Sequence, residues 1–379
     1  MRPVPPSAAD EREAARALVL RHGWNAVAYQ ILNPGMRRWF AAAGDAVAGY
    51  ASFGGVRVVA GAPVCAAGRL AEVAAELERD ANARGERVLF FGAGARLERT
   101  YAGRRDHVLV RLGAQPAWDP AGWDAIVRGK ASLRAQLHRA RNKGVAVTEW
   151  APERAREAPA LRAVLADWLA TRGLPPLGFL VTPDLLGDVR DRRVFVAGRG
   201  GEALAFLVAT PVPARAGWLV EQWPRARAAP NGTTHLLVDA AVRALAAVGA
   251  PYVTLGLAPL AAHGDPAAGA PPAWLRPLFA WLRAHGRRFY DFRGLEHFKG
   301  SLRPDAWEPV FAIAQGTRFG PGLLRAVAGA FSHGAPEALL ARALAGGARE
   351  EWRRLRARGL RRAPAAAPHR EGRGRWEGP

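Results

Sequence analysis

Lysine is the rarest basic residue in this sequence and marks the first candidate sites. Of its 54 lysines and arginines, only Lys130, Lys143 and Lys299 are lysine. An ammonium group is a compact charge that can lose its proton, whereas a guanidinium group keeps its charge. We therefore examine the segments around these lysines for acid–base or anion-binding chemistry.

Aromatic residues surround Lys299 in the segment 290–307, where Tyr290, Phe292, Phe298 and Trp307 can build a buried wall. A lysine beside such a wall can stabilise a developing oxyanion or neutralise a phosphate. The alternative is a surface cation over an aromatic ring. We predict that Lys299 projects from a loop as a catalytic residue, with Tyr290 and Phe298 in the substrate wall.

A second candidate segment runs from Glu221 to Gly232, between an expected strand and an expected helix. Glu221 ends an apolar strand and could bind an ammonium group or act as a base, or simply pair with Arg225. Asn231 precedes Gly232 at the helix start, where it could serve the site or only cap the helix. The segment lacks the glycine-rich run that would bind the pyrophosphate of an acyl-CoA at a helix N-terminus.

The third segment is a basic helix expected over residues 132–143. Its cations fall three or four residues apart, so several share one face: Lys130, Arg134, His138 and Arg141, with Arg139 and Lys143 in a neighbouring row. Like charges at these spacings repel, and a bound anion would offset that cost. The alternative is a solvated basic face.

The expected elements alternate between helices and strands. Helices are predicted over 9–22 (capped by Asp10), 66–85, 132–143, 153–172, 233–248, 272–285 and 336–360, and strands over 46–53, 56–60, 87–91, 107–112, 145–149, 193–198, 203–208, 217–223, 252–257 and 307–313. This order resembles an N-acetyltransferase-type (GNAT) fold. We predict an α/β (α+β) protein of two tandem GNAT-like halves with mixed, mainly antiparallel sheets, at 1–125 and 126–317.

Composition narrows the possible partners. The net charge of +21 favours an anionic partner such as RNA or anionic lipid, although it also reflects a general use of arginine.

Residues 318–379 carry 13 Arg against 5 Glu. We expect a basic helix and a disordered tail at 363–379 that bind membrane or RNA, or a helix that docks on the domain. The single cysteine, Cys65, excludes a disulfide framework, and no histidine spacing suggests a metal site. No signal peptide or membrane span is visible.

Several segments together resemble a known family. They are Lys130-x-x-Leu-Arg…Arg-Asn-Lys143, Pro230-Asn-Gly232, Leu255-Gly-Leu-Ala-Pro-Leu260, Tyr290-x-Phe-x-Gly-Leu-x-x-Phe-Lys299 and Pro304-x-x-Trp-Glu-Pro309. In this order they resemble the C-terminal catalytic domain of the phosphatidylglycerol lysyltransferase and alanyltransferase family, over about residues 15–315. The membrane domain usual in that family has no counterpart in the sequence.

The resemblance implies an aminoacyltransferase that moves an amino acid from aminoacyl-tRNA to an anionic membrane lipid, with no metal or other cofactor. It implies a cytoplasmic location, peripheral on the inner face of the membrane. Lys130, Arg134, Arg139 and Asn142 become candidates for lipid-phosphate or tRNA contacts. Glu221, Asn231 and the loop around Lys299 become candidates for the aminoacyl end.

One departure from the family concerns the amino acid. His235 stands where an acidic residue is expected one turn into the helix, and Asp239 follows a turn later. We therefore expect both residues to bind substrate, and we expect either a neutral amino acid rather than lysine or a different acceptor. Two other functions remain open: an acyl-CoA-dependent N-acyltransferase, and a non-catalytic basic module that binds membrane or RNA.

Overall fold

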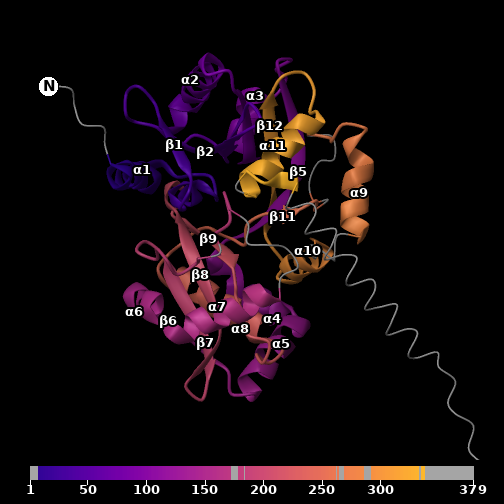
Figure 1. The fold of residues 1–379 in the computed structure, drawn as a ribbon. Coiled ribbons are helices and arrows are strands. Elements are labelled where there is room, and N and C mark those ends of the chain that lie inside the picture. The colour runs from indigo at the N-terminus through magenta and orange to yellow at the C-terminus, as the bar shows by residue number, and fades with distance from the viewer. Residues whose placement is uncertain are drawn as a thin grey trace, which may run out of the picture.

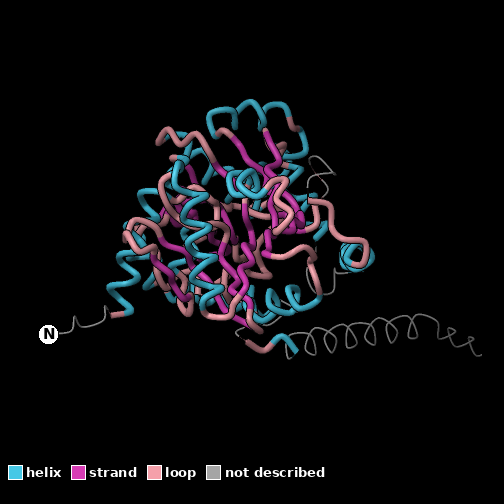
Figure 2. The backbone as a smooth tube through the Cα atoms, turned by 90° about the horizontal axis from the view of Figure 1, so that it is seen from above, coloured by secondary structure: helices cyan, strands magenta, loops and turns pink. Residues whose placement is uncertain are grey.

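The computed structural model describes residues 7–171, 178–182, 184–261, 263, 269–285, 292–332 and 334–337, without the side chains of Glu221, 281–285 and Phe292. Figure 1 shows two α/β units, one above the other, joined by strands that run between them. From above, the strands form the interior and the helices lie around them (Figure 2).

The elements alternate along the chain much as expected. The helices are α1 Ala8–His22, α2 Leu70–Ala83, α3 Ala95–Tyr101, α4 Trp123–Gly129, α5 Ala131–Asn142, α6 Pro152–Glu157, α7 Pro159–Ala170, α8 Thr233–Ala247, α9 Leu275–His285, α10 Phe292–Ser301 and α11 Pro321–Phe331. The strands are β1 Arg37–Phe40, β2 Val47–Phe53, β3 Val56–Ala60, β4 Arg87–Ala93, β5 His107–Trp118, β6 Ala146–Trp150, β7 Arg193–Arg199, β8 Glu202–Val212, β9 Gly217–Gln222, β10 Val253–Thr254, β11 Ala258–Pro259 and β12 Ala306–Gln315. Short 3-10 turns include η1 Ala28–Leu32, η2 Ala67–Arg69 and η4 Pro213–Arg215.

All the strands belong to one mixed, mainly antiparallel sheet in the order β1-β2-β3-β4-β12-β5-β10-β9-β8-β7-β6, with β11 beside β5. Its two parallel pairs are β3 with β4 and β9 with β10. Helix α2 connects the first pair and helix α8 connects the second. Each unit therefore repeats a GNAT-like order of hairpin, crossover helix, parallel strand, helix and final strand, and the predicted fold class is confirmed.

The final strands of the two units are exchanged. Strand β12, from the end of the chain, pairs with β4 of the first unit, while β5 pairs with β10 of the second. The two exchanged strands also pair with each other along ten registered positions, from Ala306↔Ala117 to Gln315↔His107. This exchange makes one sheet of both units. The predicted division at residue 125 stays a prediction.

Local sequence signals explain several elements. Gly54 and Gly55 adopt positive φ angles of 57° and 72° and close the β2–β3 hairpin, as predicted. Helix α1 begins with a capping box in which the Ser7 hydroxyl accepts from the Asp10 amide and the Asp10 carboxylate accepts from the Ser7 amide. Asp10 is thus the third helical residue and not the cap, so that prediction is wrong.

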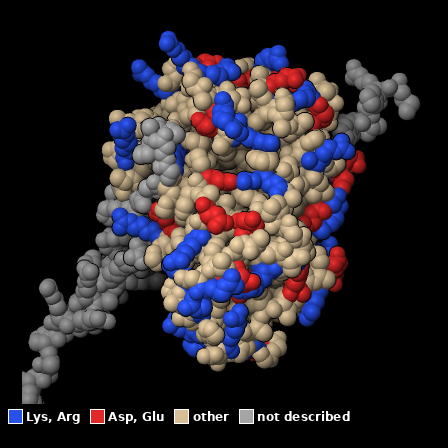
Figure 3. Space-filling model, turned by 180° about the vertical axis from the view of Figure 1, so that it is seen from behind, with Lys and Arg blue, Asp and Glu red and all other residues tan. Residues whose placement is uncertain are grey.

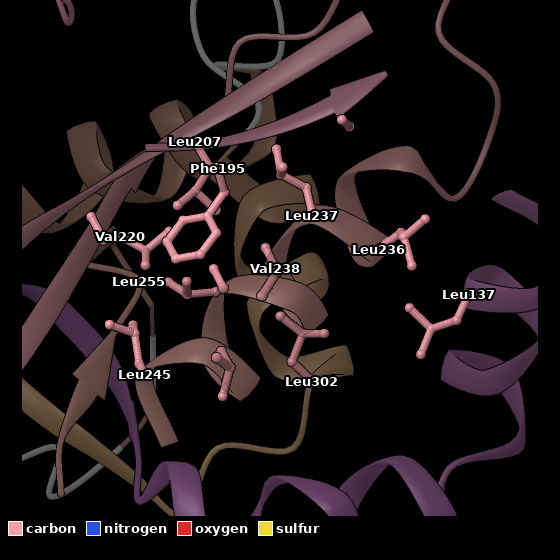
Figure 4. Close-up of a cluster of buried hydrophobic side chains, with 14 of the residues drawn as sticks. Leu137, Phe195, Leu207, Val220, Leu236, Leu237, Val238, Leu245, Leu255 and Leu302 are labelled. Carbon is pink, nitrogen blue, oxygen red and sulfur yellow. The ribbon is translucent and has the colours of Figure 1, made fainter. Parts of the chain in front are cut away.

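Hydrophobic clusters cover both faces of the sheet. In the second unit, side chains from β7, β8, β9 and α8 converge with Leu255 and Leu302 in one core, which Figure 4 shows. In the first unit, α2 packs on one face through Val73 and Leu77. Helix α11 packs on the other face through Leu323 and Ala326, so the ordered fold continues beyond β12.

Some predicted elements differ from the structure. The helix expected over 153–172 is two helices, because Ala158 leaves the helical conformation before Pro159, which then begins α7. Strand β5 is longer than expected and reaches Trp118, while α3, α4 and β1 were not predicted. The helix expected over 336–360 falls outside the described residues after Glu337, as does the tail 363–379. Within the described ranges, no helix has the length and apolarity needed to span a membrane.

Candidate active site

The parallel strands β9 and β10 separate at their carboxyl ends. Val253 and Thr254 pair with Trp218 and Leu219, but β10 ends there, while β9 continues to Gln222 alongside β8. In open α/β sheets, ligands bind beyond the carboxyl ends of strands at such a point. The residues around this opening are therefore the first place to look for a site.

Helix α8 begins at one side of the opening. Its N-cap is Gly232, whose φ of 94° lies in the left-handed region that favours glycine. A Cβ at this position would lie 2.2 Å from the Gln136 carbonyl oxygen of α5, so glycine also permits α5 and α8 to pack closely. Asn231 is exposed and does not cap the helix, and within the described ranges its side chain has no hydrogen bond. Its amide is thus available to a ligand.

Lys299 binds the backbone at the other side of the opening. Gly256, with a φ of 70°, turns the chain between β10 and β11. The Nζ of Lys299 donates to the carbonyl oxygens of Gly256 at 2.8 Å and Leu257 at 2.9 Å. Lys299 lies on helix α10 rather than in a loop, so the predicted loop is wrong.

Burial changes the chemistry of Lys299. The side chain is 2% exposed, and this desolvation lowers its pKa to about 7. A neutral amine has two N–H groups and one lone pair. The two N–H groups can donate to the two carbonyl oxygens, which leaves the lone pair free to accept a proton. Near neutral pH, Lys299 can therefore either hold or release a proton, as a general acid–base group requires.

Aromatic rings cover the neighbouring part of α10. The ring of Phe298 lies 5.4 Å from that of Trp223, just after β9, and 5.0 Å from that of His235 in the first turn of α8. Burial lowers the pKa of His235, which keeps the imidazole neutral at pH 7. The predicted wall residue Phe298 and the predicted binding residue His235 are thus in contact, and Trp223 joins them.

Helix α10 also fixes a more distant wall of the opening. Glu296 pairs with the His263 Nε2 at 3.3 Å, and the His263 ring stacks on Trp307 at 4.0 Å between centroids. The end of α10 is held by the buried Leu302, whose carbonyl accepts from the Trp118 indole at 3.0 Å. These contacts fix α10 relative to β5 and β12, and through them Lys299 relative to β10.

The basic helix α5 forms beside α8, as predicted, but its cations have different surroundings. Arg134 donates to the Val127 and Arg128 carbonyls at the end of α4, so it caps that helix. Arg139 is exposed and donates to Gln136 at 3.4 Å, while Asn142 is exposed and Lys130 is half-buried at the N-cap of α5. An anion can still reach Lys130, Arg139 and Asn142, whereas Arg134 caps the end of α4.

Asp239 lies away from the opening. Its carboxylate is 1% exposed and accepts from the Trp123 indole at 2.9 Å, from Arg243 at 2.9 Å and from Arg141 at 3.2 Å. These bonds tie α8 to α4 and α5. The substrate-binding role predicted for Asp239 gains no support from this placement.

Two predicted residues lie outside what the structure describes. The backbone of Glu221 lies in β9, one residue before its end at Gln222, but its side chain is not described, and Tyr290 falls outside the described residues. Among the described residues, no group of His, Cys, Asp and Glu side chains could hold a metal ion. The candidate site therefore consists of Trp223, Asn231, His235, Phe298 and Lys299.

Sequence reasoning missed Trp223, Glu296 and His263. Trp223 directly follows an apolar strand and precedes Pro224, a signal that a strand end lies there. Glu296 and His263 lie 33 positions apart, and no local pattern links them.

Fold and site together define the class of protein. The sequence matches the family described as phosphatidylglycerol lysyltransferase, C-terminal, over residues 16–314, and the chain belongs to that family. It is a transferase of the lysylphosphatidylglycerol synthetase type.

Two solved structures share the fold. One is the C-terminal domain of a putative lysylphosphatidylglycerol synthetase from Agrobacterium fabrum, with 22% identity, a TM-score of 0.72 and coverage of 86% of this chain and 99% of that one. The other is L-PGS from Bacillus licheniformis, with 20% identity, a TM-score of 0.70 and coverage of 87% and 97%. A comparison with curated proteins finds no significant match.

Proposed function

We propose that this protein transfers an amino acid from aminoacyl-tRNA to the hydroxyl group of an anionic phospholipid such as phosphatidylglycerol. The observation that carries the proposal is Lys299, a buried lysine with a pKa of about 7 at the opening between β9 and β10. Family membership supports the lipid acceptor, and the absence of a glycine-rich loop before Gly232 favours a donor other than acyl-CoA.

The reaction would exchange one ester for another. The lipid hydroxyl attacks the aminoacyl carbonyl, and the ribose oxygen of the tRNA leaves. The Nζ of neutral Lys299 accepts the proton of the attacking hydroxyl and then returns a proton to the leaving oxygen. Because the ester is already activated, positioning and proton transfer suffice, and no further cofactor is needed.

The residues around Lys299 suggest a neutral amino acid. His235 is uncharged at pH 7, and the nearest acid on α8, Asp239, is occupied by Arg141, Arg243 and Trp123. A lysyl side chain would find no free carboxylate on this helix, and an unpaired buried charge is costly. We therefore propose an aminoacyl group with an uncharged side chain.

Accessible residues at and next to α5 would contact the tRNA or lipid phosphates at the edge of the site. Lys130, Arg139 and Asn142 offer charge and hydrogen-bond donors there. We place the protein on the inner face of the membrane, where aminoacyl-tRNA and anionic lipid are both present.

The test is transfer of radiolabelled amino acid from aminoacyl-tRNA to vesicles that contain phosphatidylglycerol, followed by lipid extraction and chromatography. Label in the lipid supports the proposal. No label in any lipid with any aminoacyl-tRNA, or transfer from acyl-CoA instead, contradicts it.

A further inference from the structure

A cavity lies in the first unit, at the place that corresponds in the topology to the candidate active site. It has a volume of about 190 Å³ and lies beyond the carboxyl ends of β3 and β4, the other parallel pair. Ala62 follows β3 in its wall, and Gly92 and Gly94 line it at the end of β4. The repeated topology thus places one opening in each unit, and both occupy the position where α/β sheets bind ligands.

Arginines give this cavity a positive charge that the described residues do not neutralise. Arg96 and Arg99 line it from one face of α3. The Arg96 guanidinium lies 3.6 Å from the centroid of the Trp24 ring, and within the described ranges it has no carboxylate partner. Burial, together with the charges of Arg99 and Arg215, lowers the pKa of Arg96. A bound anion would remove this repulsion.

The acid that lines the cavity, Glu308, is fully engaged. Its carboxylate accepts from both terminal nitrogens of Arg215, at 2.9 and 2.6 Å, from Gln115 at 2.8 Å and from the Tyr252 hydroxyl at 2.9 Å. The charges of Arg215 and Glu308 therefore neutralise each other, and Arg96 and Arg99 supply the net positive charge of the cavity. Figure 3 shows basic and acidic groups interspersed on the visible part of one face of the molecule.

The remaining wall is mostly apolar, although His22 and Asn25 also line it. It includes Ala62, Val64, Leu70, Leu97 and Val310. An anion with a hydrocarbon part would satisfy both the guanidinium groups and this wall, because guanidinium groups bind phosphate through paired hydrogen bonds. A free inorganic ion would leave the apolar wall without a partner.

A nucleic acid fits this cavity poorly. Single-stranded RNA is bound in open basic grooves whose aromatic side chains stack on the bases. Here the Trp24 ring already has the guanidinium of Arg96 at 3.6 Å and that of Arg215 at 5.1 Å. Trp24 is therefore not free for a base.

The geometry points to a glycerophosphate-binding site in this cavity, with Arg96 and Arg99 on the phosphate and the apolar wall against the carbon chain of a lipid. The inference rests on the proposed function, since it assigns the phosphate of the acceptor lipid to the first unit. Trp307 and Glu308 are adjacent on β12: Glu308 lines the cavity, and Trp307 stacks on His263, which pairs with Glu296 of the helix that carries Lys299.

The experiment measures binding to the full chain by calorimetry, with glycerophosphoglycerol, inorganic phosphate and phosphatidylglycerol vesicles as separate probes. We expect Arg96→Gln to bind glycerophosphoglycerol about tenfold more weakly, the loss typical of one charged hydrogen bond. Arg96→Lys, which keeps the charge but loses the planar fork, should weaken binding less. Ala67→Leu, which fills part of the cavity without a charge change, should also weaken binding. Arg79→Gln, an exposed change on α2, is the matched control and should bind normally.

Several results would overturn the inference. One is equal binding of glycerophosphoglycerol by the wild type and by folded Arg96→Gln and Ala67→Leu. Another is displacement of glycerophosphoglycerol by an RNA ending in CCA. A third is binding of inorganic phosphate with no affinity for the lipid probes. Lys299→Gln should keep glycerophosphoglycerol binding while losing transfer. If the wild type binds through Arg96 but transfers nothing, the proposed function fails and the cavity assignment stands. If it transfers normally with Arg96→Gln, only the cavity assignment fails.

Discussion

At the scale of single residues, Lys299 combines two costs that a merely structural lysine would avoid. It is removed from water, and its ammonium form meets no carboxylate among the described residues, only two backbone carbonyls. A methionine or leucine would fill the same space without the loss of charge solvation. The loss of stability from burying Lys299 indicates that this lysine serves a chemical role.

The low pKa of Lys299 predicts how stability depends on pH. Its pKa falls from 10.5 in the unfolded chain to about 7 in the folded protein, so between these values the unfolded chain binds more protons. This residue therefore makes the free energy of unfolding rise with pH across that window, by at most about 1.4 kcal/mol per pH unit. Lys299→Met should remove this rise, as measured by denaturant unfolding at pH 7 to 10.

The control for this prediction is Lys143→Met, which changes an exposed lysine at the end of α5. It should leave the pH dependence as in the wild type. An identical pH dependence for Lys299→Met and the wild type would mean that Lys299 keeps its ordinary proton affinity in the folded state.

His235 predicts the amino-acid preference. His235→Asp places a carboxylate in the first turn of α8, beside Phe298, where a cationic side chain could pair with it. We expect the ratio of lysyl to alanyl transfer to rise about tenfold, the value of one charge-assisted hydrogen bond. Parallel assays with the two aminoacyl-tRNAs measure this ratio, and His235→Asn, which adds no charge, should not change it. If His235→Asp leaves this ratio unchanged, His235 does not contact the aminoacyl side chain.

At the scale of elements, the close packing of α5 on α8 depends on Gly232. Gly232→Ala would force a side chain into the left-handed region and against the Gln136 carbonyl oxygen. We expect a loss of at least about 2 kcal/mol in the free energy of unfolding, from strain and overpacking together. Gly249→Ala is the matched control, because Gly249 also has a positive φ of 73° but open space around it.

Gly249→Ala should therefore show only the conformational part of the loss. Thermal unfolding of both variants separates the two contributions. Equal losses for the two variants would mean that the contact between Gly232 and α5 does not matter for stability.

Elements with a strong local pattern were predicted well, and the helix that carries Lys299 was not. The helix expected over 233–248 is α8, and the hairpin at Gly54 and Gly55 is present. In contrast, Gly294 and Gly300 made the region of α10 resemble a loop, although its Phe298 and Lys299 face the site. Tertiary contacts with Trp223 and Gly256 stabilise this helix, and such contacts have no signature in the local sequence.

At the scale of the whole molecule, the exchange of β5 and β12 joins the two units. No local pattern reveals which distant strands will pair, so the sequence predicted two halves but not their exchange. The same topology places the cavity beside Arg96 and the opening beside Lys299 in corresponding positions. Helix α11 shows that the first part of the basic segment 318–379 belongs to the fold.

The exchange predicts that neither unit folds alone. A fragment of residues 7–125 lacks β12, which pairs with β4, and a fragment of residues 126–337 lacks β5, which pairs with β10. We expect each fragment to be unfolded or aggregated by circular dichroism and size-exclusion chromatography. Co-expression should restore a folded complex, since all strand partners are then present. A folded, monomeric 7–125 fragment would contradict this account of the sheet.

The central claim is that Lys299 carries a proton during aminoacyl transfer to a lipid. The most direct measurement is the rate of label transfer from aminoacyl-tRNA to phosphatidylglycerol vesicles, as a function of pH, for the wild type, Lys299→Gln and Lys299→Arg. The wild-type rate should rise with pH through about 7, where the amine becomes neutral, and then level off. Both variants should lose at least about a hundredfold in rate, the usual contribution of general base catalysis. Folded variants that transfer at the wild-type rate with an unchanged pH profile would contradict it.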